Sequence, residues 1–461
     1  MPVDFRAILT TLAALASGAL AAFALTNPPL QDWAIVASQS EIDRWISSGP
    51  TSVALGAVVA VFACALSQRS GSRRAAWIAV AAATAIIALI RVAVPEVAVL
   101  DLLITFVVLK SIAAGVILGC AVAASWDRIA AKNGVLLGVI AGYLSARAFG
   151  TGAGRMSTSA VGEPAWLLLA ATAVMAVACA ITAQSGFRIR RPDAGEIRVA
   201  LIAAIALAIG HRVLGSIVDR QEFASTGTAW IVMILCAAAA LALTAIAARQ
   251  LGEQSGAGGK FLWAATALAA ASAPTLMLVN GEHGQWASLE SPWVVVLASG
   301  VAVALGLRLS KRIPATVAVV ILAVVPLSEL LPFTTAHAAV SIVVKIAALG
   351  FGGAALLGAL APASLVDATL GLAIPFAAMT FTSIAVLAYQ LSWPPVRVNF
   401  AYVEGEVEPA TDTMTIPVDY VNAQTIGTAL LFVTIIAVCG AAIRRVPQTS
   451  NSAESGVSDA H

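Results

Sequence analysis

The chain has 461 residues, of which 60% are hydrophobic and only 11% are charged, and its mean hydropathy is +0.93. A soluble protein of this length needs far more charge to cover its surface, so the composition excludes that class and predicts a polytopic membrane protein. The formal net charge of +2 carries little information, because a membrane protein distributes its charges between the two sides of the bilayer.

Apolar runs of about 20 residues predict an all-α protein with about fourteen transmembrane helices and mostly short loops. With a cytoplasmic N-terminus, most Lys and Arg fall in the cytoplasmic loops, as the positive-inside rule requires. We therefore expect both termini in the cytoplasm and a location in the bacterial inner membrane. The expected spans are 8–25, 51–67, 76–94, 99–125, 134–150, 165–185, 198–218, 229–248, 261–279, 292–309, 314–331, 337–360, 366–389 and 425–443.

Two of the expected outer loops are longer than the others. In residues 26–50, the stretch "SQSEIDRWISS" predicts a short interfacial helix that begins at Ser40 and turns Trp45 and Ile46 toward lipid. Residues 390–424 alternate in a way that indicates a β-hairpin, and they are acidic. This loop is either simply solvated or a docking site for an extracytoplasmic protein, and the acidic residues that would make the contact are Glu404, Glu406, Glu408 and Asp412.

Two lysines stand inside apolar spans. The stretches "LKSIAAGVILG" (109–119) and "VKIAALGFGGA" (344–354) align on Lys110 and Lys345, with Ala three positions later and Gly five positions later in both. A charge at the centre of a membrane helix costs roughly 2.5–3.5 kcal/mol, so each lysine needs a partner or a function. The match predicts that spans 99–125 and 337–360 are equivalent helices of an internal repeat.

Glycines recur every fourth residue in the span 134–150, at Gly134, Gly138 and Gly142. This spacing puts them on one helix face, where they allow a second helix to approach closely. We expect this stripe to be a helix-packing surface.

Short motifs link the chain to a known family. The loop "CALSQRSGSRR" (64–74) fits the pattern G-x-L-a-D-R-x-G-R-R-R, and "VVLKSIAAG" and "GVIAGYLSAR" fit two further patterns more loosely. With these motifs the chain resembles the major facilitator superfamily, specifically its fourteen-helix drug/proton antiporter branch. Several signature residues differ, because Gln68 replaces the loop Asp, Val107 the Arg of the fourth helix and Ser17 the Asp of the first helix.

The resemblance implies two six-helix halves around a central cavity. The halves would be residues 1–197 and 261–445, with two inserted helices and a linker at 198–260, and with a disordered cytoplasmic tail at 446–461. The loop motif implies a gating role for its conserved members, which are Arg69, Gly71, Arg73 and Arg74.

An apolar cavity with two cations suits an anionic amphiphile, such as a membrane lipid. The expected substrate-binding residues are Lys110, Lys345 and Ser17, and the expected coupling carboxylates are Glu329 and Asp101. The alternative is that the two lysines pair with these carboxylates and only stabilise the fold.

Three functions are compatible with the sequence. The first is a transporter that exports or flips an amphiphilic, anionic, lipid-like substrate. The second is a transport-inactive relative that serves as a membrane subunit of a cell-envelope complex, which the missing signature residues favour. The third is a membrane-embedded transferase acting on lipid-linked substrates, for which the only carboxylates in the first outer loop are Asp32, Glu41 and Asp43.

Signals of enzymatic chemistry are missing from the sequence. We find no phosphate-binding glycine loop and no nucleophile triad, and the five cysteines lie in apolar runs without a CxxC spacing. We therefore expect a protein that is not an enzyme, with no catalytic residue, cofactor, metal site or nucleic-acid partner.

Overall fold

The computed structural model describes residues 5–27, 38–94, 99–149, 161–162, 164–183, 194–220, 223, 225–255, 257–279, 293–331, 338–377, 379–392 and 423–445. Nearly all of these residues are helical, and none of them belongs to a β-strand. The expected hairpin in the loop 390–424 lies outside the described residues, apart from the end of a helix at 392.

The first part of the chain forms eight helices among the described residues. They are α1 (Phe5–Thr26), α2 (Gln39–Ser70), α3 (Arg73–Ala93), α4 (Leu100–Ser125), α5 (Ile129–Ala146), α6 (Trp166–Thr182), α7 (Ala194–Asp219) and α8 (Thr226–Ser255). The second part forms α9 (Gly258–Val279), α10 (Trp293–Leu309), α11 (Ala315–Leu327), α12 (Ala338–Ala359), α13 (Leu365–Ala377), α14 (Met379–Ser392) and α15 (Ala423–Arg445). Short 3₁₀ turns follow α5 (Arg147–Phe149) and α11 (Ser328–Leu330).

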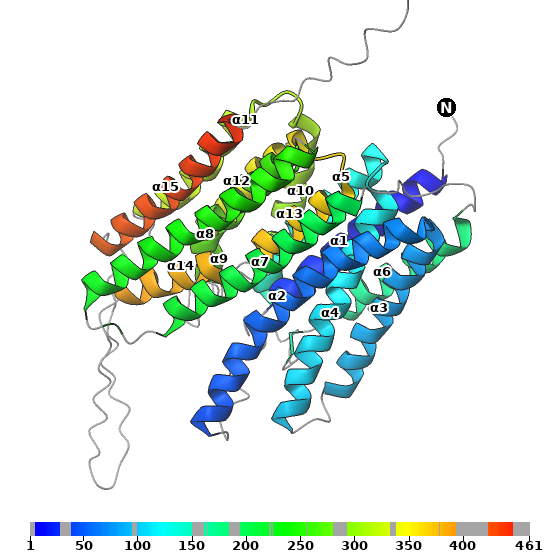
Figure 1. Cartoon of the computed structure of the whole chain (residues 1–461), viewed down its shortest axis with the longest axis horizontal. Coiled ribbons are helices and arrows are strands. Elements are labelled where there is room, and N and C mark those ends of the chain that lie inside the picture. Colours follow the sequence, from blue (N-terminus) through cyan, green and yellow to red (C-terminus); the bar gives the residue numbers. More distant parts are fainter. Residues whose placement is uncertain are drawn as a thin grey trace, which may run out of the picture.

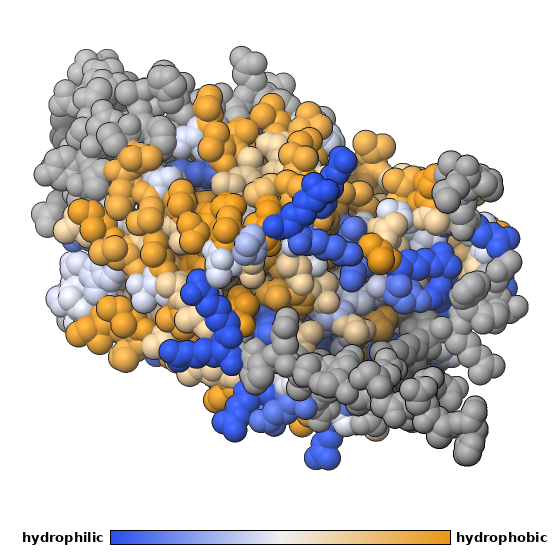
Figure 2. Space-filling view, turned by 90° about the horizontal axis from the view of Figure 1, so that it is seen from above, coloured by the Kyte–Doolittle hydropathy of each residue, from blue (hydrophilic) through white to orange (hydrophobic). Residues whose placement is uncertain are grey.

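Ten helical segments in the described part of the chain are long and apolar enough to cross a membrane, and three more apolar helices are shorter. An α-helix satisfies its own backbone hydrogen bonds, so such segments are stable in a hydrocarbon environment. The described part of the chain is therefore all-α and has the architecture of a polytopic membrane protein, as the composition predicts. Figure 2 shows the corresponding surface, with hydrophobic residues over much of the visible face.

The interfacial helix expected in the stretch 38–48, with its start at Ser40, is wrong in two respects. It is the first part of α2, which continues through Pro50 as a single helix of 32 residues. Its N-cap is Ser38, whose backbone N–H (2.8 Å) and hydroxyl (2.6 Å) both donate to the Glu41 carboxylate. These hydrogen bonds lower the pKa of Glu41.

Trp45 does not face lipid, because it is buried in a small apolar cluster with α3 and α4. The cluster contains Ile90, Val94, Leu103 and Val107. A large aromatic side chain gains more from this packing than a smaller one would, since burial is favourable in proportion to apolar area. The neighbouring Ile46 is 53% exposed, as expected.

The helix pairs α1–α5 and α2–α4 are in very close contact. A Cβ added to Gly134 would lie 2.6 Å from the Thr11 carbonyl oxygen, and one added to Gly142 would lie 2.8 Å from that of Ala19. At Gly138, between them, an added Cβ would overlap the Leu15 carbonyl oxygen. The backbones of α5 and α1 thus touch directly along the glycine stripe.

The pair α2–α4 has the same kind of contact, which the sequence analysis did not identify. Gly115 and Gly119 of α4 face the backbone of α2 at Gly56 and Ala60. The four-residue spacing of Gly115 and Gly119 was a visible signal, but α2 contributes a single glycine, Gly56, to the contact.

In Figure 1, helices α1–α6 lie on one side of the molecule and α9–α15 on the other. The main contacts between the two sides are α2 with α13 and α5 with α10. Helix α7 packs against α2, α13 and α14, so it covers one flank of this junction.

Candidate functional site

Lys110 lies in α4 and is only 2% exposed. Its ammonium group donates to the carbonyl oxygen of Val161 (2.6 Å) and lies 3.4 Å from those of Asn27 and Gly162. The amide of Asn27, at the end of α1, donates to the Gly162 carbonyl as well (3.2 Å). Lys110 therefore ties the end of α1 to the segment that precedes α6.

We expect Lys110→Met to lower the free energy of unfolding by about 1–3 kcal/mol, because buried carbonyl oxygens lose a charged donor. Thermal unfolding of the purified protein in detergent measures this change. The control is Lys311→Met, since Lys311 is exposed in the turn between α10 and α11. Equal melting temperatures for the two variants would contradict this structural role.

Lys345, in α12, forms an ion pair with Glu329 in the 3₁₀ turn that follows α11, with an N–O distance of 2.8 Å. The two side chains are 8% and 19% exposed, so the pair is largely shielded from the surroundings. This contact is the one expected if a carboxylate stabilises the lysine. It also keeps Glu329 close to one of the two lysines, as a coupling role would require.

Asp101 lies in the first turn of α4 and does not pair with Lys110, as one alternative had it. It lies nine residues before Lys110, which is about two and a half turns along α4, so it is too far away to pair with that lysine. It pairs instead with Arg44 of α2 at 2.6 Å, and both side chains are mostly exposed. The sequence could not distinguish these partners, because Arg44 is 57 residues away in the chain.

Ser17 is fully buried in α1, and its hydroxyl has no hydrogen-bond partner among the described residues. It lies ten residues before Asn27, which contacts Lys110, and this spacing corresponds to about 15 Å along the helix. The structure therefore does not bring Ser17 and Lys110 together.

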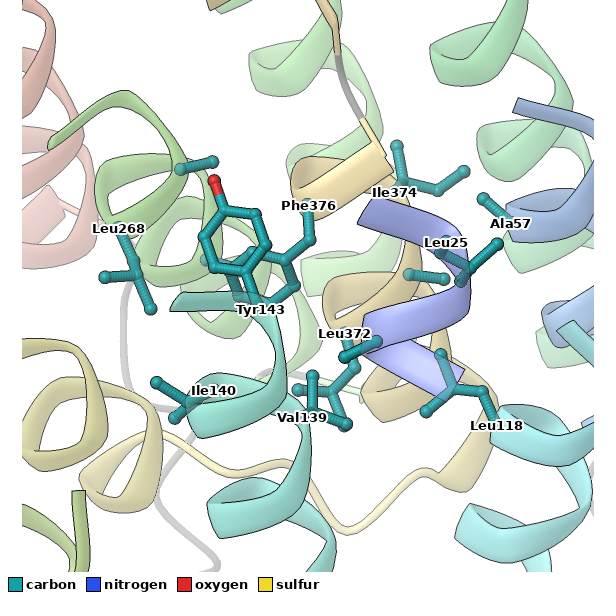
Figure 3. Close-up of a cluster of buried hydrophobic side chains, with 14 of the residues drawn as sticks. Leu25, Ala57, Leu118, Val139, Ile140, Tyr143, Leu268, Leu372, Ile374 and Phe376 are labelled. Atoms are coloured by element: carbon teal, nitrogen blue, oxygen red, sulfur yellow. The ribbon is translucent and has the colours of Figure 1, made fainter. Parts of the chain in front are cut away.

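Apolar side chains occupy the region between the two sides of the molecule, where the resemblance implied a cavity. Figure 3 shows this cluster, with residues from α1, α2, α4, α5, α9 and α13. The Tyr143 ring of α5 lies 4.7 Å from the ring of Phe376, and its hydroxyl shares a hydrogen bond of 2.7 Å with Ser272 of α9. The members labelled in the figure are Leu25, Ala57, Leu118, Val139, Ile140, Tyr143, Leu268, Leu372, Ile374 and Phe376.

The loop between α2 and α3 has a defined local structure. Gly71 ends α2 with a φ of 68°, a left-handed conformation that glycine adopts without steric cost, and its N–H bonds to the Ser67 carbonyl oxygen at 3.1 Å. Arg73 pairs with Asp127 in the turn between α4 and α5. Asp127 was not among the predicted site residues, and it contacts Arg73, the first residue of α3.

The other two arginines expected to gate, Arg69 and Arg74, are exposed. Near the same end of the bundle, the indole N–H of Trp126 donates to the Pro362 carbonyl oxygen at 2.8 Å. This bond joins the end of α4 to the connection between α12 and α13. It therefore crosses between the two sides of the molecule, and the sequence contained no sign of it.

The acidic residues that we expected to bind a partner, Glu404, Glu406, Glu408 and Asp412, lie outside the described residues. The tail 446–461 lies outside them too.

Comparison with known proteins adds no family: no protein-family model and no curated protein matches the chain.

Proposed function

We propose that the protein is a membrane transporter of the major facilitator type that moves an amphiphilic, anionic, lipid-like substrate across or between the leaflets of the bilayer. In this proposal α1–α6 and α9–α15 are two equivalent halves, with α13 and α14 together forming one span. Helices α7 and α8 are then the two inserted helices.

The repeated pattern of helix packing carries the proposal. Helix α1 packs on α4, α5 and α6, while α9 packs on α12, on α13 with α14, and on α15. Helix α4 packs on α2 and α3, while α12 packs on α10 and α11. The pairs α3–α6 and α11–α15 correspond in the same way. Exchanging the halves converts each of these contacts into another of them, which is the pattern that a parallel repeat would produce.

The contacts between the two proposed halves are also exchanged when the halves are exchanged. Its main contacts are α2–α13 and α10–α5, and exchanging the halves turns each contact into the other. A reciprocal junction of this kind lets one half rock against the other, as alternating access in such transporters requires.

The two buried lysines support an anionic substrate. In this proposal Lys110 and Lys345 occupy corresponding helices, α4 and α12, and each side chain is nearly inaccessible. Both already have contacts, with carbonyl oxygens and with Glu329 respectively. A substrate headgroup must therefore replace these contacts when the halves separate, and Glu329 is the carboxylate that the substrate would displace.

A transport-inactive membrane subunit is the second candidate. The observation that favours it is the apolar cluster between the halves, with its Tyr143–Ser272 hydrogen bond (Figure 3). Transport requires this cluster and the Trp126–Pro362 bond to open, whereas a subunit with a purely structural role can keep them closed.

Proteoliposomes test the proposal. We expect the reconstituted protein to move a fluorescent phosphatidylglycerol between leaflets faster than empty liposomes do, and Lys110→Met to lose this activity in its folded fraction. Lys110→Arg, which keeps the charge, should retain part of the activity, and the exposed Lys311→Met should retain all of it. If the wild-type protein moves no lipid and copurifies with a stoichiometric partner in mild detergent, the subunit function replaces the transporter.

A further inference from the structure

A surface groove of about 800 Å³ lies between the end of α2 and the first turns of α7. Arg69 of α2 lines one side. Among the described residues, helix α7 supplies the other lining side chains, which are Ala194, Ile197, Arg198, Leu201, Ile202 and Ile205. The groove thus has cationic residues near one end and aliphatic side chains along its length.

The two arginines lie near the same end of the bundle. Arg69 is in the last turn of α2, and Arg198 is one turn into α7. Both side chains are exposed, and neither forms an ion pair or hydrogen bond with another described residue. Glu196 does not neutralise Arg198, because residues two positions apart point to opposite sides of a helix.

The aliphatic wall extends from the arginines toward the middle of the helix. Ile197, Leu201 and Ile205 follow one another at four-residue spacing, so they form a continuous strip about 12 Å long. Ile202 and Ile205 are 52% and 46% exposed. A strip of this length fits part of an acyl chain and offers nothing to a small, fully hydrated anion.

Contacts farther along α7 join this helix to its neighbours. The guanidinium of Arg212 donates to the Thr51 hydroxyl of α2 at 3.0 Å. On another face of α7, the His211 ring and the Thr380 hydroxyl of α14 share a hydrogen bond of 3.0 Å. These contacts attach the far part of α7 to α2 and α14, while the groove lies between α2 and α7 at the opposite end.

We propose that this groove binds an anionic phospholipid, with the headgroup phosphate between Arg69 and Arg198 and one acyl chain along Ile197, Leu201 and Ile205. Guanidinium groups bind phosphate oxygens through charge-assisted, bidentate hydrogen bonds. Both helices are long and apolar enough to cross a membrane, which puts the arginines at the depth of lipid headgroups. The lipid here is a bound component of the protein, so the site does not depend on the proposed transport.

Native mass spectrometry of the full chain tests the site, in detergent micelles doped with phosphatidylglycerol or with phosphatidylcholine. We expect the wild-type protein to retain phosphatidylglycerol in preference to phosphatidylcholine. The double variant Arg69→Ala/Arg198→Ala should bind phosphatidylglycerol roughly 30-fold more weakly, since each arginine near a headgroup contributes roughly a factor of five.

The matched control is Arg249→Ala. Arg249 is an exposed arginine near the end of α8, which packs against α7, and we expect its variant to bind phosphatidylglycerol like the wild type. Equal binding by the double variant and the control would overturn the proposal, and so would equal retention of the two lipids. If the double variant does not fold, Arg198→Gln alone should weaken binding roughly fivefold, and an unchanged affinity would overturn the proposal equally.

Discussion

Gly138→Val is expected to destabilise the protein by about 3 kcal/mol or more, at the upper end of the range for overpacked sites. The added Cβ would overlap the Leu15 carbonyl oxygen of α1, and the nitrogen of Ala19 would lie only 2.8 Å away. Both atoms belong to the backbone, so no side chain can rotate to make room. A lower melting temperature and loss of the monodisperse peak in size-exclusion chromatography would measure the effect.

The control for this substitution is Gly300→Val. Gly300 also lies in a membrane-type helix, α10, but a Cβ added there would meet no atom within 4 Å. The same change in size and helix propensity is therefore expected to leave the melting temperature nearly unchanged. If both variants melt at the same temperature as the wild type, the close approach of α5 to α1 is wrong.

Lys345→Met is expected to lower the free energy of unfolding by about 3–5 kcal/mol. The substitution leaves the Glu329 carboxylate in a largely buried position without its ion-pair partner. The double variant Lys345→Met/Glu329→Leu should regain most of the lost stability, because an apolar pair of similar volume is tolerated where an uncompensated charge is not. Thermal unfolding of the two single variants and the double variant forms a double-mutant cycle that measures the coupling.

The exposed ion pair between Arg44 and Asp101 is the control for the buried pair between Lys345 and Glu329. Its side chains are 61% and 70% exposed, so solvent screens the interaction. Arg44→Ala is therefore expected to change the stability by no more than about 1 kcal/mol. Equal losses for Arg44→Ala and Lys345→Met would show that burial does not strengthen the Lys345–Glu329 pair.

The sequence predicts the helical membrane architecture well, because a spanning segment must be both apolar and helical. It fails at the start of α2. There the polar stretch around Glu41 and the proline at position 50 resemble a separate surface segment, although the helix continues through Pro50. Hydropathy alone cannot show that Trp45 has apolar neighbours from α3 and α4.

The site could be predicted only in part. Glu329 was identifiable as a partner for Lys345 because both are charged residues in neighbouring apolar spans. The contacts of Lys110 with the carbonyl oxygens of Val161 and Gly162 were not, because a backbone carbonyl leaves no trace in the residue types. The hydrogen bond from Trp126 to the Pro362 carbonyl oxygen could not be predicted for the same reason, and the two residues are 236 positions apart in the chain.

The direct backbone contacts in α1–α5 and α2–α4 have a mechanical consequence. Where two helices touch through glycines, no intervening side chains can change rotamer to absorb a sliding or tilting motion. We therefore expect the two helices of each pair to move together as one rigid body. Any large displacement within the molecule should therefore occur at the contacts α2–α13 and α5–α10, where helices α1–α6 meet helices α9–α15.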